Sequence, residues 1–150
     1  MHLPDRLRPY PVAAFAGVTL LIWGNRVWLA WSDQDASVAG KVGSSVPITA
    51  FVVAAVVVLG LQLRGASCSR GFPTLVKAFA GGTIMYWAIR LPVIVVHGHP
   101  LPFKVVHSAL AAVSAGLAVG AWRAIRGEEQ ASAGRPRRDR SSLQSSSAAR

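Results

Sequence analysis

The 150-residue sequence contains one cysteine and only six acidic residues. A single cysteine, Cys68, cannot form an intramolecular disulfide, and it excludes redox chemistry that depends on a Cys-x-x-Cys pair. None of the acidic residues lies inside the long apolar segments of the chain. The sequence therefore disfavours transport of protons or cations on a carboxylate within a membrane.

Catalytic motifs are also missing. The Gly43-Ser44-Ser45 run lies in a predicted loop, His107 has no acid at a useful spacing, and no glycine-rich phosphate loop occurs. We therefore expect no enzymatic activity and no cofactor.

What the chain has in abundance is apolar sequence, since 52% of its residues are hydrophobic. Four segments of 18 to 23 residues carry most of them: 12–31, 46–63, 75–96 and 103–125. At a rise of about 1.5 Å per residue, each covers a hydrocarbon layer of about 30 Å. We predict an all-α membrane protein, with four transmembrane helices in an antiparallel up-down-up-down bundle.

The positive charges indicate an orientation for this bundle. The net charge is +10, and a four-span topology places 12 of the 16 basic residues on one side. Only Arg26, Lys41, Arg90 and Lys104 fall toward the other side. The positive-inside rule then predicts that both termini are cytoplasmic, and it explains the charge without a nucleic-acid partner.

The alternative interpretation of the first segment, 12–31, is a signal peptide. Its length of 20 residues exceeds the 7–15 residues usual in the apolar region of a signal peptide.

The ends and the first loop are polar. Residues 1–11 form a predicted cytoplasmic arm, and residues 126–150 a disordered basic cytoplasmic tail that either contacts anionic lipid or solvates the chain. Residues 32–45 are expected to form an outer loop, with Pro47 in the first turn of the second span. Arginine outnumbers lysine 13 to 3, a usage typical of GC-rich bacteria. The predicted location is the bacterial cytoplasmic (inner) membrane.

Small residues recur at every fourth position of the last span. Such a stripe lets another helix approach closely, which matters in lipid because hydrophobic burial no longer drives association. We expect the stripe to face the bundle interior; contact with a second copy of the chain is the alternative. Its members are Ser108, Ala112, Gly116, Gly120 and Ala124.

Two arginines, Arg26 and Arg90, lie at the same predicted depth, about 7 Å outward of the midpoints of their helices. Each must snorkel to lipid phosphates, pair with Asp33 or Asp35 of the outer loop, or bind an anionic ligand. Asn25 and His107 are further candidate residues of this anion- or lipid-binding site, and Asn25 would add donors to it. Trp23 and Trp87 would wall a pocket there or pack between helices, and His107 is expected to hydrogen-bond between helices, near Ser108 or Asn25.

His97 and His99 lie at the same outer end as His107, but no third ligand stands at a recognisable offset. We therefore predict no metal site. The leading functional hypothesis is an accessory or structural membrane component that acts through helix contacts with a protein partner or a second copy. The alternative is a carrier or binding protein for an anionic lipid or metabolite, using Arg26 and Arg90. A membrane enzyme or redox subunit with an outer metal site is a third hypothesis.

Overall fold

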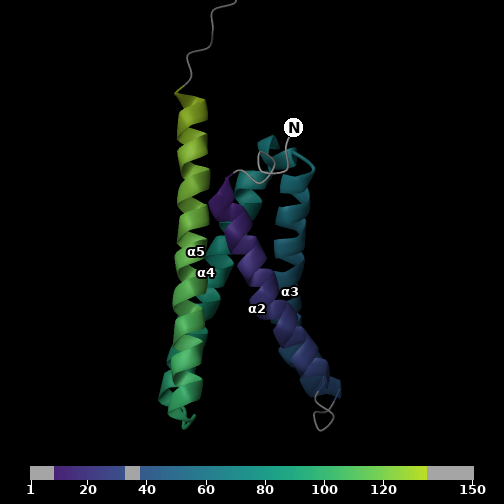
Figure 1. The fold of residues 1–150 in the computed structure, drawn as a ribbon, viewed down its shortest axis with the longest axis vertical. Helices are drawn as coiled ribbons and strands as arrows, with labels where there is room; N and C mark the ends of the chain where they lie inside the picture. Colours follow the sequence, from purple (N-terminus) through teal and green to yellow (C-terminus); the bar gives the residue numbers. More distant parts are fainter. Residues whose placement is uncertain (1–8, 33–37, 135–150) are drawn as a thin grey trace, which may run out of the picture.

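The computed structural model describes residues 9–32 and 38–134. Within these ranges the chain is helical and contains no strand. The elements are α2 (Tyr10–Ser32), α3 (Val38–Leu63), the short 3-10 helix η1 (Ala66–Cys68), α4 (Phe72–Val96) and α5 (Leu101–Ala133). Figure 1 shows the four long helices as two pairs, α2 with α3 and α4 with α5.

Proline and glycine set several helix ends. Pro73 and Pro102 lie in the first turns of α4 and α5, where a missing backbone N–H costs nothing. Gly65 follows α3 with a φ of 73°, a left-handed conformation that only glycine adopts without strain. Its N–H donates to the Gln62 carbonyl at 2.9 Å, which caps the helix.

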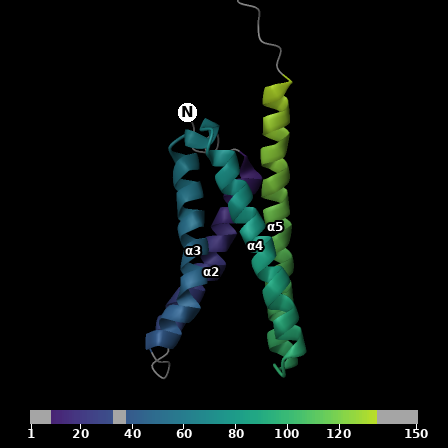
Figure 2. The same ribbon diagram turned by 180° about the vertical axis from the view of Figure 1, so that it is seen from behind.

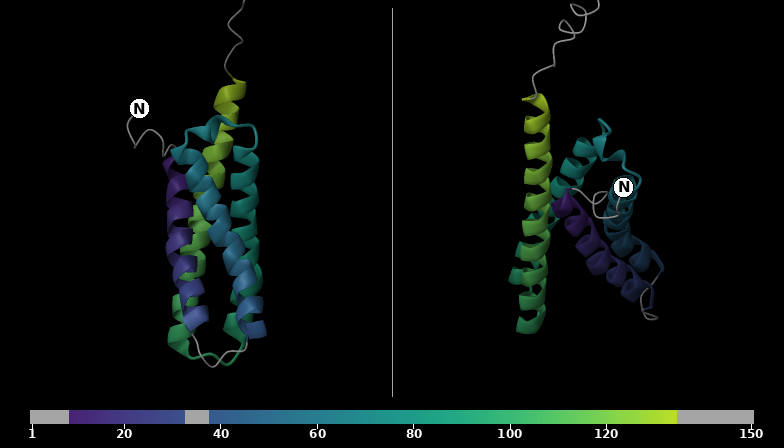
Figure 3. Two further views of the ribbon diagram at one scale, coloured as in Figure 1. Left: turned by 90° about the vertical axis from the view of Figure 1, so that its right-hand side faces the viewer. Right: turned by 45° about the horizontal axis from the view of Figure 1, so that its top comes forward.

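The helix pairs are close at one end and diverge at the other. The close end holds the start of α2, η1 and the start of α4, whereas the end of α2 and the start of α5 lie at the divergent end, named the open end here (Figures 1 and 2). Seen from the side, the α2–α3 pair lies in front of the α4–α5 pair (Figure 3). α2 contacts α5 as well as α3, so it joins the two pairs.

The main core fills the space between the helices on the side of the close end. Phe15 and Phe79 are almost fully buried, and their ring centroids are 4.5 Å apart. The hydroxyls of Thr19 and Thr83 donate to carbonyls of their own helices, at Phe15 and Phe79, so their burial leaves no polar group unpaired. The buried members are Val12, Phe15, Ala16, Ala55, Val58, Phe72, Val76, Phe79, Ala80, Ala118, Ala121 and Ile125.

Among the described residues, three helices are long and apolar enough to cross a membrane: α4, α5 and the Ser45–Leu63 part of α3. Large apolar side chains such as Val53, Met85 and Val105 are exposed on them, as expected of a surface in contact with lipid. By length and composition, these helices are those of a membrane protein. The span predicted at 12–31 corresponds to α2, whose tryptophans, Asn25 and Arg26 lower its hydropathy, and its crossing stays a prediction.

The first loop is shorter than predicted. α3 begins at Val38, so residues 38–45 are helical and Pro47 lies inside the helix instead of in its first turn. A proline there cannot donate to the carbonyl four residues earlier, but membrane helices tolerate this loss where neighbouring groups compensate. Residues 33–37 lie outside the described residues, and so do Asp33 and Asp35.

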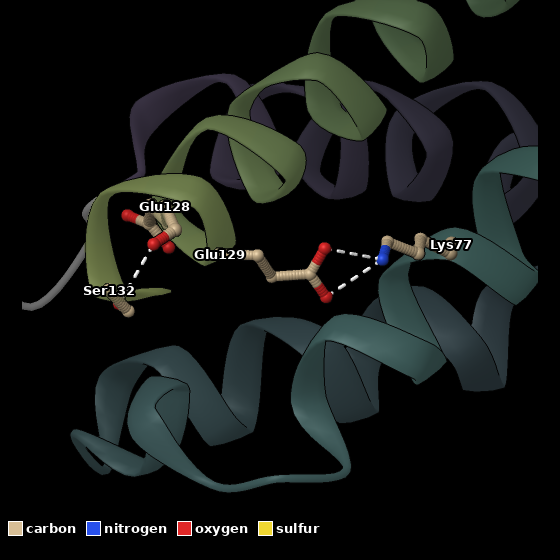
Figure 4. Close-up of polar contacts among 4 residues, drawn as sticks. All are labelled: Lys77, Glu128, Glu129 and Ser132. Carbon is tan, nitrogen blue, oxygen red and sulfur yellow. Dashed lines mark hydrogen bonds and ion pairs between the residues drawn. The ribbon is translucent and has the colours of Figure 1, made fainter. Parts of the chain in front are cut away.

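The last helix is longer than predicted. α5 continues to Ala133, so residues 126–133 are helical and not disordered, as alanine, glutamate and glutamine in this stretch favour. Figure 4 shows Lys77 of α4 donating to both carboxylate oxygens of Glu129, at 2.7 and 2.6 Å, while the Ser132 hydroxyl donates to the Glu128 carbonyl. The Lys77–Glu129 ion pair joins the extension to α4, and the Ser132 hydrogen bond lies within α5 itself. The remainder of the predicted tail, residues 135–150, lies outside the described part of the chain.

Candidate functional site

A cavity of about 830 Å³ lies between the two helix pairs at the open end. All four long helices contribute to it, which is why no single segment of the sequence marks it. Its volume is within the range of small-molecule sites, about 300–1,000 Å³. The lining residues are Ile22, Trp23, Arg26, Pro47, Ile48, Tyr86, Trp87, Arg90, Val93, Ile94, His97, His99, Phe103, His107 and Leu110.

Arg26 and His107 form a direct hydrogen bond across the cavity, from α2 to α5. The His107 Nδ1 also lies 2.9 Å from the Phe103 carbonyl oxygen, which can only accept. Because a guanidinium can only donate, Nδ1 must carry the proton and Nε2 must be the bare acceptor for Arg26. In this arrangement the imidazole is neutral, and it orients a cation without balancing its charge.

Arg90 contributes a second guanidinium to the cavity from α4. It is exposed and has no ion pair or side-chain hydrogen bond to any described residue, and Arg26 likewise has no carboxylate partner among them. The two arginines predicted at one depth thus line the same cavity. Together they leave most of their N–H donors available.

Aromatic rings form one wall of the cavity. The Trp23 ring centroid lies 5.2 Å from that of Tyr86 and 5.9 Å from that of Trp87, and Phe51 stacks on Trp23 at 5.7 Å. Trp23 and Trp87 are both buried, so the two uses suggested by the sequence, pocket wall and helix packing, are combined. This wall is apolar and held by mutual ring contacts.

One buried donor on this wall has no acceptor. The Trp87 indole N–H is inaccessible and unpaired within the described part of the chain. A buried indole N–H ordinarily has a partner, because leaving it unmade costs about 1–3 kcal/mol. Because this atom is inaccessible, the Trp87 N–H does not face the cavity, and only the ring of Trp87 contributes to the cavity wall.

The other residues predicted for the site differ in their positions: His107 lines the cavity, whereas Asn25 does not. Asn25 is exposed and does not line it, because it lies one residue from Arg26 on a different face of α2. His107 bonds to Arg26 and Phe103, and not to Asn25 or Ser108 as expected. Asp33 and Asp35 lie outside the described residues, so their ion pairs with the arginines stay a prediction.

His97 and His99 both line the cavity. The Nδ1 of His97 bonds to the Val93 carbonyl at 2.8 Å, and His99 packs on Phe103, which in turn packs on His107. In residues 9–32 and 38–134 no three His, Cys, Asp or Glu side chains are grouped as metal ligands.

Phe103 is a cavity residue that was missed at the sequence level. It lies four residues before His107, a spacing that places the two side chains on one helix face.

The small-residue stripe does not form the buried face of α5. Ala112 and Gly116 are exposed, and a Cβ added at Gly116 or Gly120 would meet no other atom within 4 Å. Ser108, Gly120 and Ala124 are partly exposed. The helix buries instead His107, Ala111, Ser114, Ala118, Ala121 and Ile125. The prediction that the stripe faces the interior of the bundle is therefore wrong for a single chain. Contact of the stripe with a second chain stays a prediction.

A polar residue that was also missed at the sequence level is Gln62, which is fully buried near the end of α3. Its side-chain amide nitrogen lies 3.5 Å from the Pro9 carbonyl, so it joins α3 to the start of α2. A lone glutamine in an apolar span is the signal that could have indicated this role.

Comparisons of the chain with protein-family models, with curated proteins and with solved structures found no match.

Proposed function

We propose that this membrane protein binds an anionic amphiphile, a lipid or a lipid-like metabolite, in the cavity between its helix pairs. The observation that carries the proposal is that Arg26 and Arg90 line one cavity without a carboxylate partner among the described residues. Guanidinium groups match carboxylate and phosphate oxygens with paired hydrogen bonds. The aromatic wall beside them suits the apolar part of such a ligand.

The same arrangement argues against simple snorkelling of both arginines. A snorkelling side chain extends toward the headgroups, whereas Arg26 is held across the cavity by His107. Its remaining donors are available to a ligand inside the cavity. A bound anion would satisfy them, and it would balance a charge that is costly at low dielectric.

Arg90→Gln should lower the affinity for a co-purified anionic lipid by about tenfold or more, because a hydrogen-bonded charged group contributes about 1.5–3 kcal/mol. Native mass spectrometry of the protein extracted in a mild non-ionic detergent would measure the retained lipid. Arg123→Gln is the matched control, since Arg123 is exposed on α5 and does not line the cavity. Equal lipid retention by both variants would contradict the proposal.

The topology that we propose has four spans running up-down-up-down, with both termini in the bacterial cytoplasm and the cavity in the outer half of the membrane. Its support is the split of basic residues, 12 against 4. A reporter fused after Gly98, in the turn between α4 and α5, should be found outside the cytoplasm, and one fused after Arg150 inside. Finding the two on the same side would overturn this topology.

A second candidate function is that of an accessory component that binds another membrane protein or a second copy. The observation that favours it is the exposure of Ala112 and Gly116 on α5, which leaves a flat strip of helix open to close approach. This surface lies on a different face of α5 from His107, so both functions are compatible with one fold.

A further inference from the structure

We propose that the ligand of the cavity carries a phosphate monoester, a dianionic head group, in preference to a carboxylate or a phosphodiester. This inference rests on the proposed binding function and names the chemical class of its ligand. It follows from three features of the cavity: its net charge, its free donors and its apolar wall.

With the lining histidines His97 and His99 counted as neutral, the charge of the lining is two positive units. Arg26 and Arg90 are permanently charged. His107 adds none, because its Nδ1 proton is used on the Phe103 carbonyl and its Nε2 accepts from Arg26. No carboxylate occurs among the lining residues. A monoanion would leave one of these charges unbalanced, whereas a phosphate monoester above its second pKa of about 6 balances both.

The free donors also outnumber what a monoanion can accept. Arg26 uses one N–H on His107, and Arg90 uses none on the described residues. A phosphate monoester offers three terminal oxygens, enough to receive both guanidinium groups, while a carboxylate or phosphodiester offers two.

The remainder of the ligand is apolar. Trp23, Tyr86 and Trp87 form a wall of mutually packed rings in the cavity that the two guanidinium groups also line. The helix pairs diverge toward this end of the molecule (Figures 1 and 2). An alkyl or isoprenoid chain attached to the phosphate would pack against this apolar wall.

Two probes that differ only in head-group charge test this inference: dodecyl phosphate, and its methyl diester, methyl dodecyl phosphate. At about pH 8 the first is a dianion and the second a monoanion. Titrations in a non-ionic detergent at matched mole fractions should show dodecyl phosphate binding at least about tenfold more tightly, as expected for one additional charged hydrogen-bonded contact.

Arg90→Gln should remove this preference, so that both probes bind the variant with affinities within about threefold of one another. Because Arg90 is exposed and forms no hydrogen bond or ion pair with the described residues, the variant should fold as the unsubstituted chain does. Its thermal unfolding without ligand checks this. Arg90→Lys keeps the charge and should retain a preference for the dianion, and Arg123→Gln should behave as the unsubstituted protein.

Equal binding of the two probes, with loss of both in Arg90→Gln, would overturn the dianion inference and leave the binding function in place. Binding that is the same in Arg90→Gln as in the unsubstituted protein would overturn both. A free phosphate-bearing metabolite and a phosphate-bearing lipid are separated by a further probe, inorganic phosphate. If inorganic phosphate competes with dodecyl phosphate at comparable concentration, the dodecyl group contributes nothing to the affinity. The ligand is then a water-soluble phosphate-bearing metabolite and not a lipid.

Discussion

Trp23→Ala should lower the free energy of unfolding in detergent by about 3–5 kcal/mol, the usual cost of truncating a buried tryptophan. Trp23 is 5% exposed and lies at the centre of the aromatic wall, where its ring contacts those of Phe51, Tyr86 and Trp87. In a membrane the loss is one of van der Waals contact and of a filled volume, because lipid is as apolar as the interior. Denaturant-induced unfolding followed by tryptophan fluorescence would measure it.

Trp28→Ala provides the control on the same helix. Its side chain is 73% exposed, so its removal should change the free energy of unfolding by less than about 0.5 kcal/mol. Similar losses for the two variants would show that the aromatic wall does not hold α2 against α4. The prediction concerns stability alone, and it holds whatever ligand the cavity accepts.

Ala118→Leu should lower the free energy of unfolding by about 1–3 kcal/mol or more, because it forces extra volume into a filled space. Ala118 is fully buried in the main core, on the side of α5 that packs against the other helices. A branched side chain there must displace its neighbours or separate the helices. Thermal unfolding of the detergent-solubilised variant would show the loss as a lower Tm.

Gly116→Leu is the matched comparison, two residues away on the exposed strip. An added Cβ at Gly116 meets nothing within 4 Å, so the stability of the single chain should be almost unchanged. If the strip binds a second chain, the variant should instead shift the protein to a smaller assembly in size-exclusion chromatography with light scattering. A larger loss of stability for Gly116→Leu than for Ala118→Leu would contradict the packing face described here.

The sequence predicted the helical class and three of the membrane-spanning helices, because apolar length is read directly from the chain. It placed two boundaries wrongly. The helical residues 38–45 and 126–133 are polar or mixed, so their helicity depends on continuation of a neighbouring helix and on contacts such as Lys77 with Glu129. Composition alone does not distinguish such extensions from loops.

The face by which a helix packs was not predictable for a different reason. In a soluble protein the buried face is the apolar one, but α5 is apolar on both its packed and its exposed sides. Small residues then mark two candidate faces, around Ala118 and around Gly116, and the sequence offers no criterion to choose. Depth depends on position along each helix, so the sequence placed Arg26 and Arg90 at one level, and both line the same cavity; that they form one site stays a prediction. The partnership of Arg26 with His107 depends on how α2 crosses α5, which only the three-dimensional arrangement gives.

The extension of α5 changes where the basic tail is attached. From the predicted end of the span at Ile125, the eight further helical residues to Ala133 carry the chain about 12 Å along the helix axis. The arginine-rich run begins directly after Gly134. Lys77 of α4 pairs with Glu129 near the middle of this extension, so the added turns remain tied to the α4–α5 pair. The last described residue, Gly134, therefore lies about two helical turns beyond the predicted end of the span.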